Sequence, residues 1–234
     1  MWSREVDGLT LTFRLAGINN QNFLMRDEQT GSFWQQISGL AISGPLKGKQ
    51  LQLIHSDELT LATWRAEEPQ GTALKDVAEF EKNYAPKNWD VRMAKQPVVK
   101  SAAEKGIADR DLMLGIRAFG AARAYPYQQV LSQKLVQDRI GSESVLLLVG
   151  SDGTSVRAFR NSAGADFYRL DPPKAGGVLM MDAASGSEWN FKGCAVEGKA
   201  KGTCLEPVPM LKDYWFDWKH YNPQTTVYSL PKGR

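Results

Sequence analysis

Residues that serve metal and redox chemistry are scarce in this chain. Two cysteines and two histidines occur in 234 residues. Cys194 and Cys204 by themselves do not supply the four ligands of a structural zinc site. His55 and His220 have no partner evident in the sequence, so we expect no metal site and find no cofactor evident. The cysteines fit either a disulfide across a hairpin, in an oxidising compartment, or two partly buried free thiols.

Long apolar runs and an excess of one charge are also absent. The longest apolar run, Val145–Val149, is far shorter than the ~20 residues of a membrane-spanning helix. Residues 1–5 lack the apolar core of a signal peptide, so we expect none at this end. Lysine and arginine number 29 against 26 aspartates and glutamates, a net charge of +3. This balance does not favour nucleic acid or an anionic membrane as a partner.

Common catalytic motifs are missing as well. No Gly-x-Ser-x-Gly, His-Glu-x-x-His or Gly-x-Gly-x-x-Gly pattern is present. Residues 193–200 resemble a phosphate-binding loop, but Ala200 stands where such a loop needs a serine or threonine for magnesium. The segment also falls among predicted strands and turns, whereas such a loop begins a helix. We therefore reject a nucleotide site, and the sequence does not decide whether the protein is an enzyme.

What the sequence does contain is an internal repeat. Phe13-Arg14-Leu15 recurs as Tyr168-Arg169-Leu170. At the same separation, the residues Leu24, Asp27, Gly31, Ser32 and Trp34 recur as Leu179, Asp182, Gly186, Ser187 and Trp189. After the loss of one residue, the residues Gly39, Ala41, Gly44, Gly48, Leu51, Trp64 and Pro69 match Gly193, Ala195, Gly198, Gly202, Leu205, Trp218 and Pro223. This agreement over about 60 residues predicts two related units.

Each unit has the pattern of antiparallel hairpins followed by one helix. In the first unit the predicted elements are strands at Leu9–Leu15, Phe23–Arg26, Ser32–Gln36, Leu40–Ile42 and Gln50–Ile54, and a helix from Ser56 to about Glu68. The matching helix of the second unit is expected from Leu211 to about Tyr221. A preface to the second unit, residues 110–160, adds predicted strands at Leu112–Phe119, Ala121–Tyr125, Lys134–Gln137, Val145–Val149 and Ser155–Arg160, and a short helix after Pro126.

We therefore predict a β-rich α+β protein of two pseudo-equivalent antiparallel hairpin units, each closed by a helix. The first unit spans residues 1–70, a partly helical linker spans 71–109, and the second unit with its preface spans 110–234. A preface for the first unit would need about 45 residues before Met1, so we expect this unit to be N-terminally incomplete. Its first strand then lacks a neighbour, and an unpaired edge predicts a homodimer through the first unit.

Two segments resemble a known family. Residues 22–36, followed by Gly39 and Gly44-Pro45, are similar to the signature of the domain-of-unknown-function 3179 family, and residues 120–126 resemble its second recurrent motif. The resemblance covers nearly the whole chain. It implies a mainly prokaryotic protein with no established activity, and it leans towards an extracytoplasmic location. It also implies an upstream Cys-x-x-Cys segment, which does not occur before Met1, so we expect any metal or redox site built on that pair to be absent.

Asp27, Thr30 and Trp34 form one group of candidate ligand residues. A carboxylate, a hydroxyl and an indole on one hairpin could bind a small polar ligand. The aspartate and tryptophan recur in the second unit, however, and residues present in both units most simply serve the shared fold. A turn in which Asp27 and Thr30 cap the backbone is the favoured interpretation.

Two further pairs are candidates. Asn22 and Gln36 correspond to Gly177 and to the deleted position, and polar residues unique to one copy are better functional candidates than shared ones. Arg123 and Tyr125 alternate along a predicted strand and so face one side. Arg123 could bind a carboxylate or phosphate there, although an ion pair beside a packed tyrosine ring is the favoured interpretation.

The function hypothesis follows from the lack of a complete catalytic set. We expect a binding or structural protein, or a catalytically incomplete member of the family. The alternative is an enzyme with a site between the two repeats, formed by Asn22, Gln36, Asp27 and Arg123, whose metal or redox cysteines lie in a missing upstream segment. The aromatic residues 214–218 favour an apolar core stripe rather than a sugar-binding groove.

Overall fold

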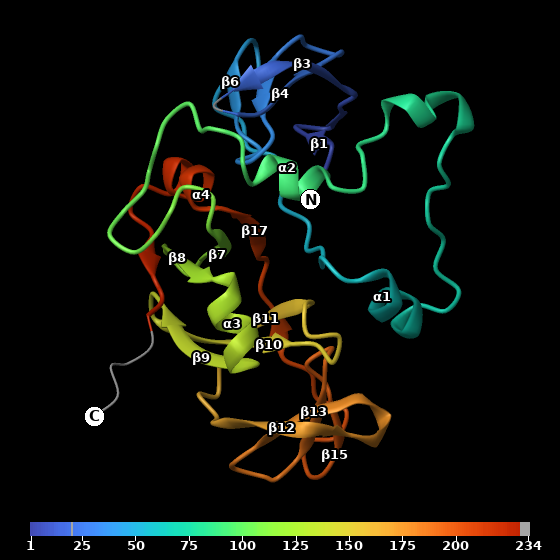
Figure 1. Ribbon diagram of the computed structural model, residues 1–234, viewed down its shortest axis with the longest axis vertical. Helices are drawn as coiled ribbons and strands as arrows, with labels where there is room; N and C mark the ends of the chain where they lie inside the picture. Colours follow the sequence, from blue (N-terminus) through green and yellow to red (C-terminus); the bar gives the residue numbers. More distant parts are fainter. Residues whose placement is uncertain (20, 230–234) are drawn as a thin grey trace.

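The computed structural model describes residues 1–19 and 21–229 (Figure 1). It is rich in strands and has few, short helices, which confirms the predicted β-rich α+β class. Three parts follow one another along the long axis of the molecule. The hairpin sheet of the first repeat lies at one end, the hairpin sheet of the second repeat lies at the other, and a central module separates them.

The first hairpin sheet has the strand order β3-β4-β5-β6. Its strands are β3 (Phe13–Asn19), β4 (Asn22–Asp27), β5 (Phe33–Gln35) and β6 (Ala41–Ser43), preceded by a small hairpin of β1 (Glu5–Val6) and β2 (Leu9–Thr10). Its core is small and consists of Leu11, Trp34, Ala41 and Leu51. The predicted strand Leu9–Leu15 is wrong in its middle, because Leu11 leaves the strand path and is fully buried in this core.

The second hairpin sheet has the equivalent order, β12-β13-β14-β15. Its strands are β12 (Phe167–Lys174), β13 (Val178–Asp182), β14 (Glu188–Asn190) and β15 (Ala195–Glu197), with a short 3₁₀ turn η2 (Ala175–Gly177) before β13. Unlike the first sheet, it shares its core with the central module: Phe167 and Trp189 belong to the same buried cluster as Leu146 and Phe159. The two repeats are therefore attached to the rest of the molecule in different ways.

At the first strand of each hairpin sheet, the structural equivalence between the two repeats is shifted by one residue from the sequence alignment. Phe13 and Phe167 occupy equivalent positions, with ring centroids 5.9 Å and 5.4 Å from the tryptophan of their own sheets. Tyr168, which the sequence aligned with Phe13, is 57% exposed. Because side chains alternate across a strand, a slip of one residue moves an aromatic ring from the core to solvent. The alignment of Phe13 with Tyr168 is therefore wrong.

The central module consists of two four-stranded sheets and a helix. One sheet, in the order β17-β7-β8-β18, contains β7 (Leu112–Ala118), β8 (Ala121–Pro126), β17 (Leu211–Tyr214) and β18 (Thr226–Val227). The other, in the order β16-β11-β10-β9, contains β9 (Leu135–Ile140), β10 (Glu143–Val149), β11 (Val156–Arg160) and β16 (Glu206–Pro207). The helix α3 (Tyr127–Gln133) follows Pro126, as predicted. The main buried cluster joins both sheets to this helix, with Ile116, Val130 and Leu147 among its members.

The helices of the two repeats begin later than the sequence predicts. Helix α1 (Leu61–Glu67) is capped by Thr60, whose hydroxyl accepts a hydrogen bond from the backbone N–H of Thr63, so the predicted start at Ser56 is wrong. Helix α4 (Trp215–Tyr221) likewise does not begin at Leu211. Residues 211–214 instead pair with β7, an interaction between distant segments that local periodicity does not reveal.

Each of these helices fastens a different part of the molecule to the central module. The hydroxyls of Thr60 and Thr63 both donate to the carboxylate of Asp152 at 2.7 Å, which ties α1 to the loop between β10 and β11. Helix α4 packs on β7, where Trp218 lies directly over Gly115, and a Cβ at that position would meet the ring at 2.3 Å. Helix α4 also contacts the first hairpin sheet, through the hydrogen bonds of Asn22 to Asp217.

The linker is partly helical, with η1 (Ala78–Asn83) and α2 (Trp89–Met93), and passes around the outside of the molecule (Figure 1). Its apolar residues Leu74, Val77 and Tyr84 are all exposed. Strand β3 is an edge of its sheet and leaves Leu15 and Ile18 exposed. A homodimer through this edge stays a prediction.

Among the described residues, no helix has the length and apolar character needed to cross a membrane.

Candidate functional site

The hairpin candidates Asp27, Thr30 and Trp34 form a closed hydrogen-bonded turn. One oxygen of the buried Asp27 carboxylate accepts from the Thr30 backbone at 2.5 Å. The other accepts from the Thr30 hydroxyl at 3.0 Å and from the Trp34 indole N–H at 2.8 Å. Burial by itself would raise the pKa of Asp27, but these hydrogen bonds outweigh it and hold the pKa below its ordinary value.

The second repeat has the same turn with the same contacts. Asp182 accepts from the Ser185 backbone at 2.6 Å, from the Ser185 hydroxyl at 2.9 Å and from the Trp189 indole at 3.0 Å. Burial opposes a low pKa of Asp182, and here too the hydrogen bonds prevail. An arrangement present in both repeats, with its donors already used, supports a role in the fold for Asp27, Thr30 and Trp34.

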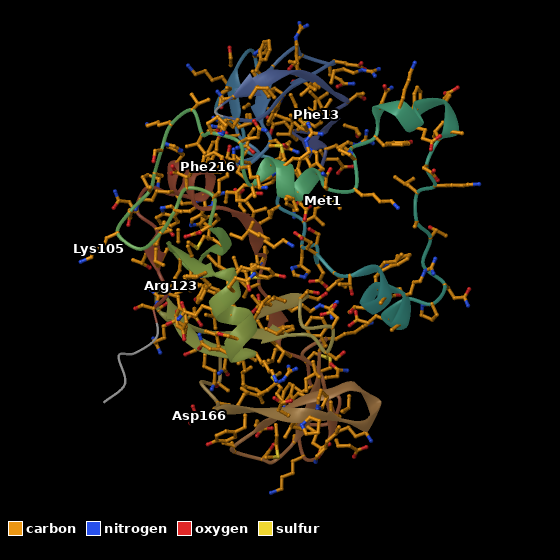
Figure 2. The ribbon with its side chains drawn as sticks, viewed as in Figure 1. Met1, Phe13, Lys105, Arg123, Asp166 and Phe216 are labelled. Atoms are coloured by element: carbon orange, nitrogen blue, oxygen red, sulfur yellow. A yellow bond between two sulfur atoms is a disulfide. The ribbon has the colours of Figure 1, made fainter. Side chains whose placement is uncertain are left out.

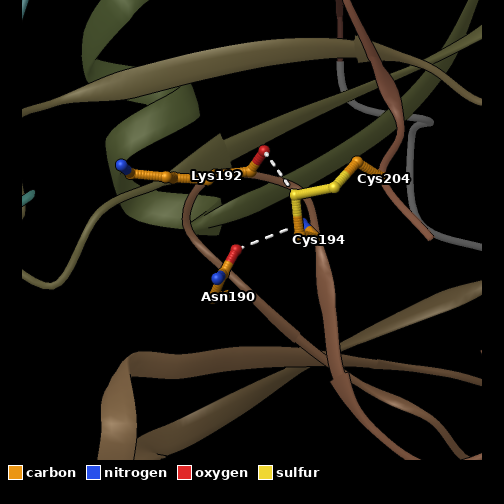
Figure 3. The surroundings of a disulfide bond; sticks show 4 residues. All are labelled: Asn190, Lys192, Cys194 and Cys204. Atoms are coloured by element: carbon orange, nitrogen blue, oxygen red, sulfur yellow. Dashed lines mark hydrogen bonds between the residues drawn. A yellow bond between two sulfur atoms is a disulfide. The ribbon is translucent and has the colours of Figure 1, made fainter. Parts of the chain in front are cut away.

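The two cysteines form a disulfide in the second hairpin sheet (Figure 3). Cys194 and Cys204 face each other as an antiparallel backbone bridge, and the Cys194 backbone N–H donates to the side chain of Asn190. In the first repeat the same bridge joins Leu40 and Gln50, without a covalent link. Of the two alternatives for the cysteines, the structure has the disulfide. The described part of the chain has no cluster of three or more metal-binding side chains.

Arg123 and Tyr125 belong to β8 of the central module. Figure 2 shows Arg123 well apart from Phe13 of the first hairpin sheet. The Arg123 guanidinium forms an ion pair with Asp138 and donates to the Thr226 hydroxyl at 3.1 Å. It also lies over the rings of Tyr125 and Tyr228. Burial and the charge of Asp138 raise the pKa of Tyr125. Because its hydrogen-bonding capacity is engaged within the protein, Arg123 acts here as a packing and ion-pairing residue.

Asn22 and Gln36, in contrast, line a cleft between the repeats. The cleft, of about 420 Å³, lies between the first hairpin sheet and the central module near β7, β17 and α4. Its polar lining includes Asn22, Gln36, Arg117, Lys212 and Asp213. Its apolar lining includes Trp2, Ile37, Leu53, Ile54, Met210 and Leu211. We call this space the inter-repeat cleft.

Asn22 connects the two sides of the inter-repeat cleft. Its side-chain amide donates to both carboxylate oxygens of Asp217, at 2.6 Å and 2.7 Å. Asn22 begins β4 of the first hairpin sheet, and Asp217 is a buried residue of α4. A buried carboxylate is costly without donors, so this amide stabilises the charge of Asp217 and joins the sheet to the helix.

Asp217 is paired with a second carboxyl group, that of Asp213. The two carboxyl groups lie close enough for the charge of one to oppose ionisation of the other, and among the described residues the buried Asp213 Oδ2 has no hydrogen-bond partner. Burial and the negative charge of Asp217 raise the pKa of Asp213 to about 8. Burial also raises the pKa of Asp217, against the hydrogen bond from Asn22. The pair therefore holds a proton at neutral pH, and Asp213 is the member that lines the cleft.

Two side chains of the cleft have unused hydrogen-bonding groups. Within the described part of the chain, the Arg117 guanidinium has no carboxylate partner and no hydrogen bond, and the residue is exposed. The Gln36 amide side chain likewise has no partner among the described residues, while the Gln36 carbonyl accepts from the Trp2 indole at 2.7 Å. Lys212 differs from Arg117, because it forms an ion pair with Glu58 and lies over the Tyr127 ring.

The sequence interpretation missed Asp213, Asp217 and Arg117. Asp217 lies within the aromatic segment 214–218, and the prediction of a core stripe there is correct for Trp215 and Trp218, which are buried. A signal was nevertheless present, because the counterparts of Asp213 and Asp217 in the first repeat are Leu59 and Thr63. Both acids are thus unique to the second copy, just as Asn22 and Gln36 are unique to the first.

A second cleft, of about 510 Å³, lies between α1 and the central module. Its one buried cation, Arg157, is bound by Glu67 through two hydrogen bonds of 2.7 Å and 2.8 Å and by Asp57 at 2.8 Å. The guanidinium also lies 4.6 Å from the ring centroid of Phe191. These contacts fasten α1 to the central module, and they engage all three guanidinium nitrogens of Arg157. His55, on the rim of this cleft, contacts Asp57 at 3.2 Å.

Comparisons with known proteins give one result. No curated protein and no solved structure matches the chain. The family described as "Protein of unknown function (DUF3179)" matches residues 1–225, which include both hairpin sheets, the central module except β18, and every residue that lines the inter-repeat cleft. The resemblance of the two sequence motifs to this family is confirmed, and the chain belongs to the DUF3179 family.

Proposed function

We propose that this protein binds a small ligand in the inter-repeat cleft. The observation that carries the proposal is the convergence of copy-specific polar residues. Asn22 and Gln36, found only in the first repeat, face Asp213, found only in the second, across one cleft. The residues shared by both repeats form the hairpin turns instead. When residues that differ between two repeats gather at one place, they indicate a role beyond forming the fold that the repeats share.

The dimensions and lining of the cleft support this proposal. A volume of about 420 Å³ lies within the range of small-molecule sites in proteins, roughly 300–1,000 Å³. Such sites combine apolar walls with a few polar groups that fix orientation. Here Leu53, Ile54 and Leu211 supply the exposed apolar side chains, and Gln36 and Arg117 supply unused donors.

A second candidate, acid–base catalysis on the bound ligand, is favoured by the Asp213–Asp217 pair. A carboxyl group with a pKa near the working pH can donate a proton in one step and accept it in the next. Asp213 is the residue that would contact the ligand, and Asp217 would act through it by setting its charge. Turnover of a bound compound by the wild type and its loss in Asp213→Asn, with binding retained, would distinguish this candidate from binding alone.

The test of ligand binding compares an obstructed cleft with an intact one. Backbone amide shifts are recorded while a mixture of small neutral, acidic and basic organic compounds is titrated into the wild type, Ser56→Trp and Ser162→Trp. Ser56 lines the cleft, whereas Ser162 is an exposed loop residue far from it in the chain. The proposal predicts that compounds shift amides of β7 and β17 in the wild type and in Ser162→Trp, but not in Ser56→Trp. Equal shifts in all three proteins, or none in the wild type, would contradict it.

A further inference from the structure

The charges around the inter-repeat cleft are unequal. Arg117 has a full positive charge with no carboxylate partner in the described chain. Lys212 adds a second cation, only partly neutralised because its partner Glu58 is 65% exposed. Among the described lining residues, the one acidic side chain is Asp213. The cleft therefore has an excess of positive charge on the surface that a ligand would meet.

Asp213 does not reverse this balance. Burial and the negative charge of Asp217 raise the pKa of Asp213 to about 8, so at neutral pH the pair together has one negative charge rather than two. That charge is held on the side away from the cleft, since Asp217 is buried and does not line it, and both Asp217 oxygens accept from Asn22. A protonated Asp213 therefore adds no negative charge to the lining of the cleft.

The apolar part of the cleft is also exposed. Leu53 is 43%, Ile54 45% and Leu211 38% exposed, and all three line the same space. Large apolar side chains left open beside unpaired polar groups are typical of a site for a molecule with an apolar body and a polar end. A cationic or purely polar ligand would leave either the free guanidinium or these side chains without a partner.

We infer that the ligand of the inter-repeat cleft is a small amphipathic organic anion, an inference that rests on the proposed function. Its acidic group would lie at Arg117 and its apolar body against Leu53, Ile54 and Leu211. A guanidinium matches a carboxylate in shape and charge and binds it through paired hydrogen bonds. The unused Gln36 amide is a further donor on the same lining. Arg117 is thus the residue that determines the charge class of the ligand.

The inference is tested with three probes of equal chain length: octanoate, octylammonium and neutral octanol. Binding to the full chain is measured by calorimetry and by amide shifts, in the wild type, Arg117→Gln and Arg65→Gln. Arg65 is an exposed residue of α1 outside the inter-repeat cleft, so its replacement makes the same change of net charge elsewhere. We expect octanoate to bind most tightly and Arg117→Gln to weaken it about tenfold, with Arg65→Gln unchanged.

The outcomes separate this inference from the proposed function. Binding of octylammonium or octanol at the cleft as tightly as octanoate, or an equal effect of both arginine variants, would overturn the anion class while the cleft remained a binding site. If none of the three probes shifts amides lining the cleft, the anion inference fails. The mixture titration of Ser56→Trp and Ser162→Trp then decides separately whether the proposed function fails too. A fold check by far-ultraviolet circular dichroism accompanies each variant.

Discussion

The side-chain amide of Asn22 donates to both carboxylate oxygens of Asp217, 195 positions later in the chain. This contact joins β4 of the first hairpin sheet to α4 of the central module. The first hairpin sheet has its own small core, so polar contacts of this kind matter for how it is held. The same contact fixes one wall of the inter-repeat cleft and sets the charge of the Asp213–Asp217 pair.

Replacing Asn22 should therefore lower stability. In Asn22→Ala the buried Asp217 carboxylate loses its two hydrogen bonds from the amide, and we expect a loss of about 2 kcal/mol in the free energy of unfolding. Urea unfolding measures it, with Asn88→Ala as the control, because Asn88 is exposed. Equal stability of Asn22→Ala and the control would show that this contact does not hold the sheet in place.

The pKa of Asp213 predicts a dependence of stability on pH. Its value of about 8 in the folded protein lies above the ordinary 3.8. Between these two values the unfolded chain releases the proton and the folded chain retains it, so this group lowers the free energy of unfolding as pH rises from about 4 to about 8. Asp213→Asn cannot ionise, and its stability relative to the wild type should therefore increase over that range.

The control for this measurement is Asp166→Asn, a change of the same kind at an exposed position. Chemical unfolding at a series of pH values gives the difference between each variant and the wild type. A difference for Asp213→Asn that does not change with pH would contradict a retained proton at this site.

The two hairpin turns allow a matched comparison. Asp27→Ala and Asp182→Ala each remove a buried carboxylate that accepts from an indole, a hydroxyl and backbone N–H groups, at a cost of about 3 kcal/mol. The consequences should differ in extent, because the second hairpin sheet shares its core with the central module and the first does not.

Amide hydrogen exchange measures this difference. Asp27→Ala should speed exchange within the first hairpin sheet alone, whereas Asp182→Ala should also speed exchange in β10 and β11. The same pattern of exchange in both variants would contradict the difference in attachment that the buried clusters indicate.

The disulfide should contribute to stability without being needed for the fold. Reduction of Cys194–Cys204, or the double variant with serine at both positions, removes the constraint of a short loop, with an expected loss of about 2 kcal/mol. The backbone bridge should persist, because Leu40 and Gln50 form it in the first repeat without a covalent link. Circular dichroism and thermal unfolding with and without a reductant measure both effects, and loss of the whole fold on reduction would contradict the expectation.

The sequence predicted those parts of the structure that depend on local pattern and on the repeat. The turns at Asp27 and Asp182 could be identified because Asp, Thr or Ser, and Gly each have a defined role in a tight turn. The selection of Asn22 and Gln36 as copy-specific residues also led to the cleft they line. These inferences needed only neighbouring residues or a comparison of one repeat with the other.

The rest depended on contacts between distant segments. Residues 211–214 have the apolar spacing of a helix, but pairing with β7 makes them a strand. That strand places Asp213 beside Asp217, and periodicity contains no information about such a pairing. Arg117 was missed for a related reason: an exposed arginine on a strand is ordinary until the opposing wall of the cleft is known.

The most direct test of the inter-repeat cleft as a ligand site uses Gln36, whose side-chain amide makes no internal hydrogen bond in the described chain. Octanoate binding is measured by amide shifts in the wild type, in Gln36→Ala and in Gln128→Ala, a control at an exposed position of α3. We predict that shifts in the wild type and in Gln128→Ala map to β7 and β17, and that Gln36→Ala binds more weakly at unchanged thermal stability. Shifts that map elsewhere, or equal binding by all three proteins, would contradict it.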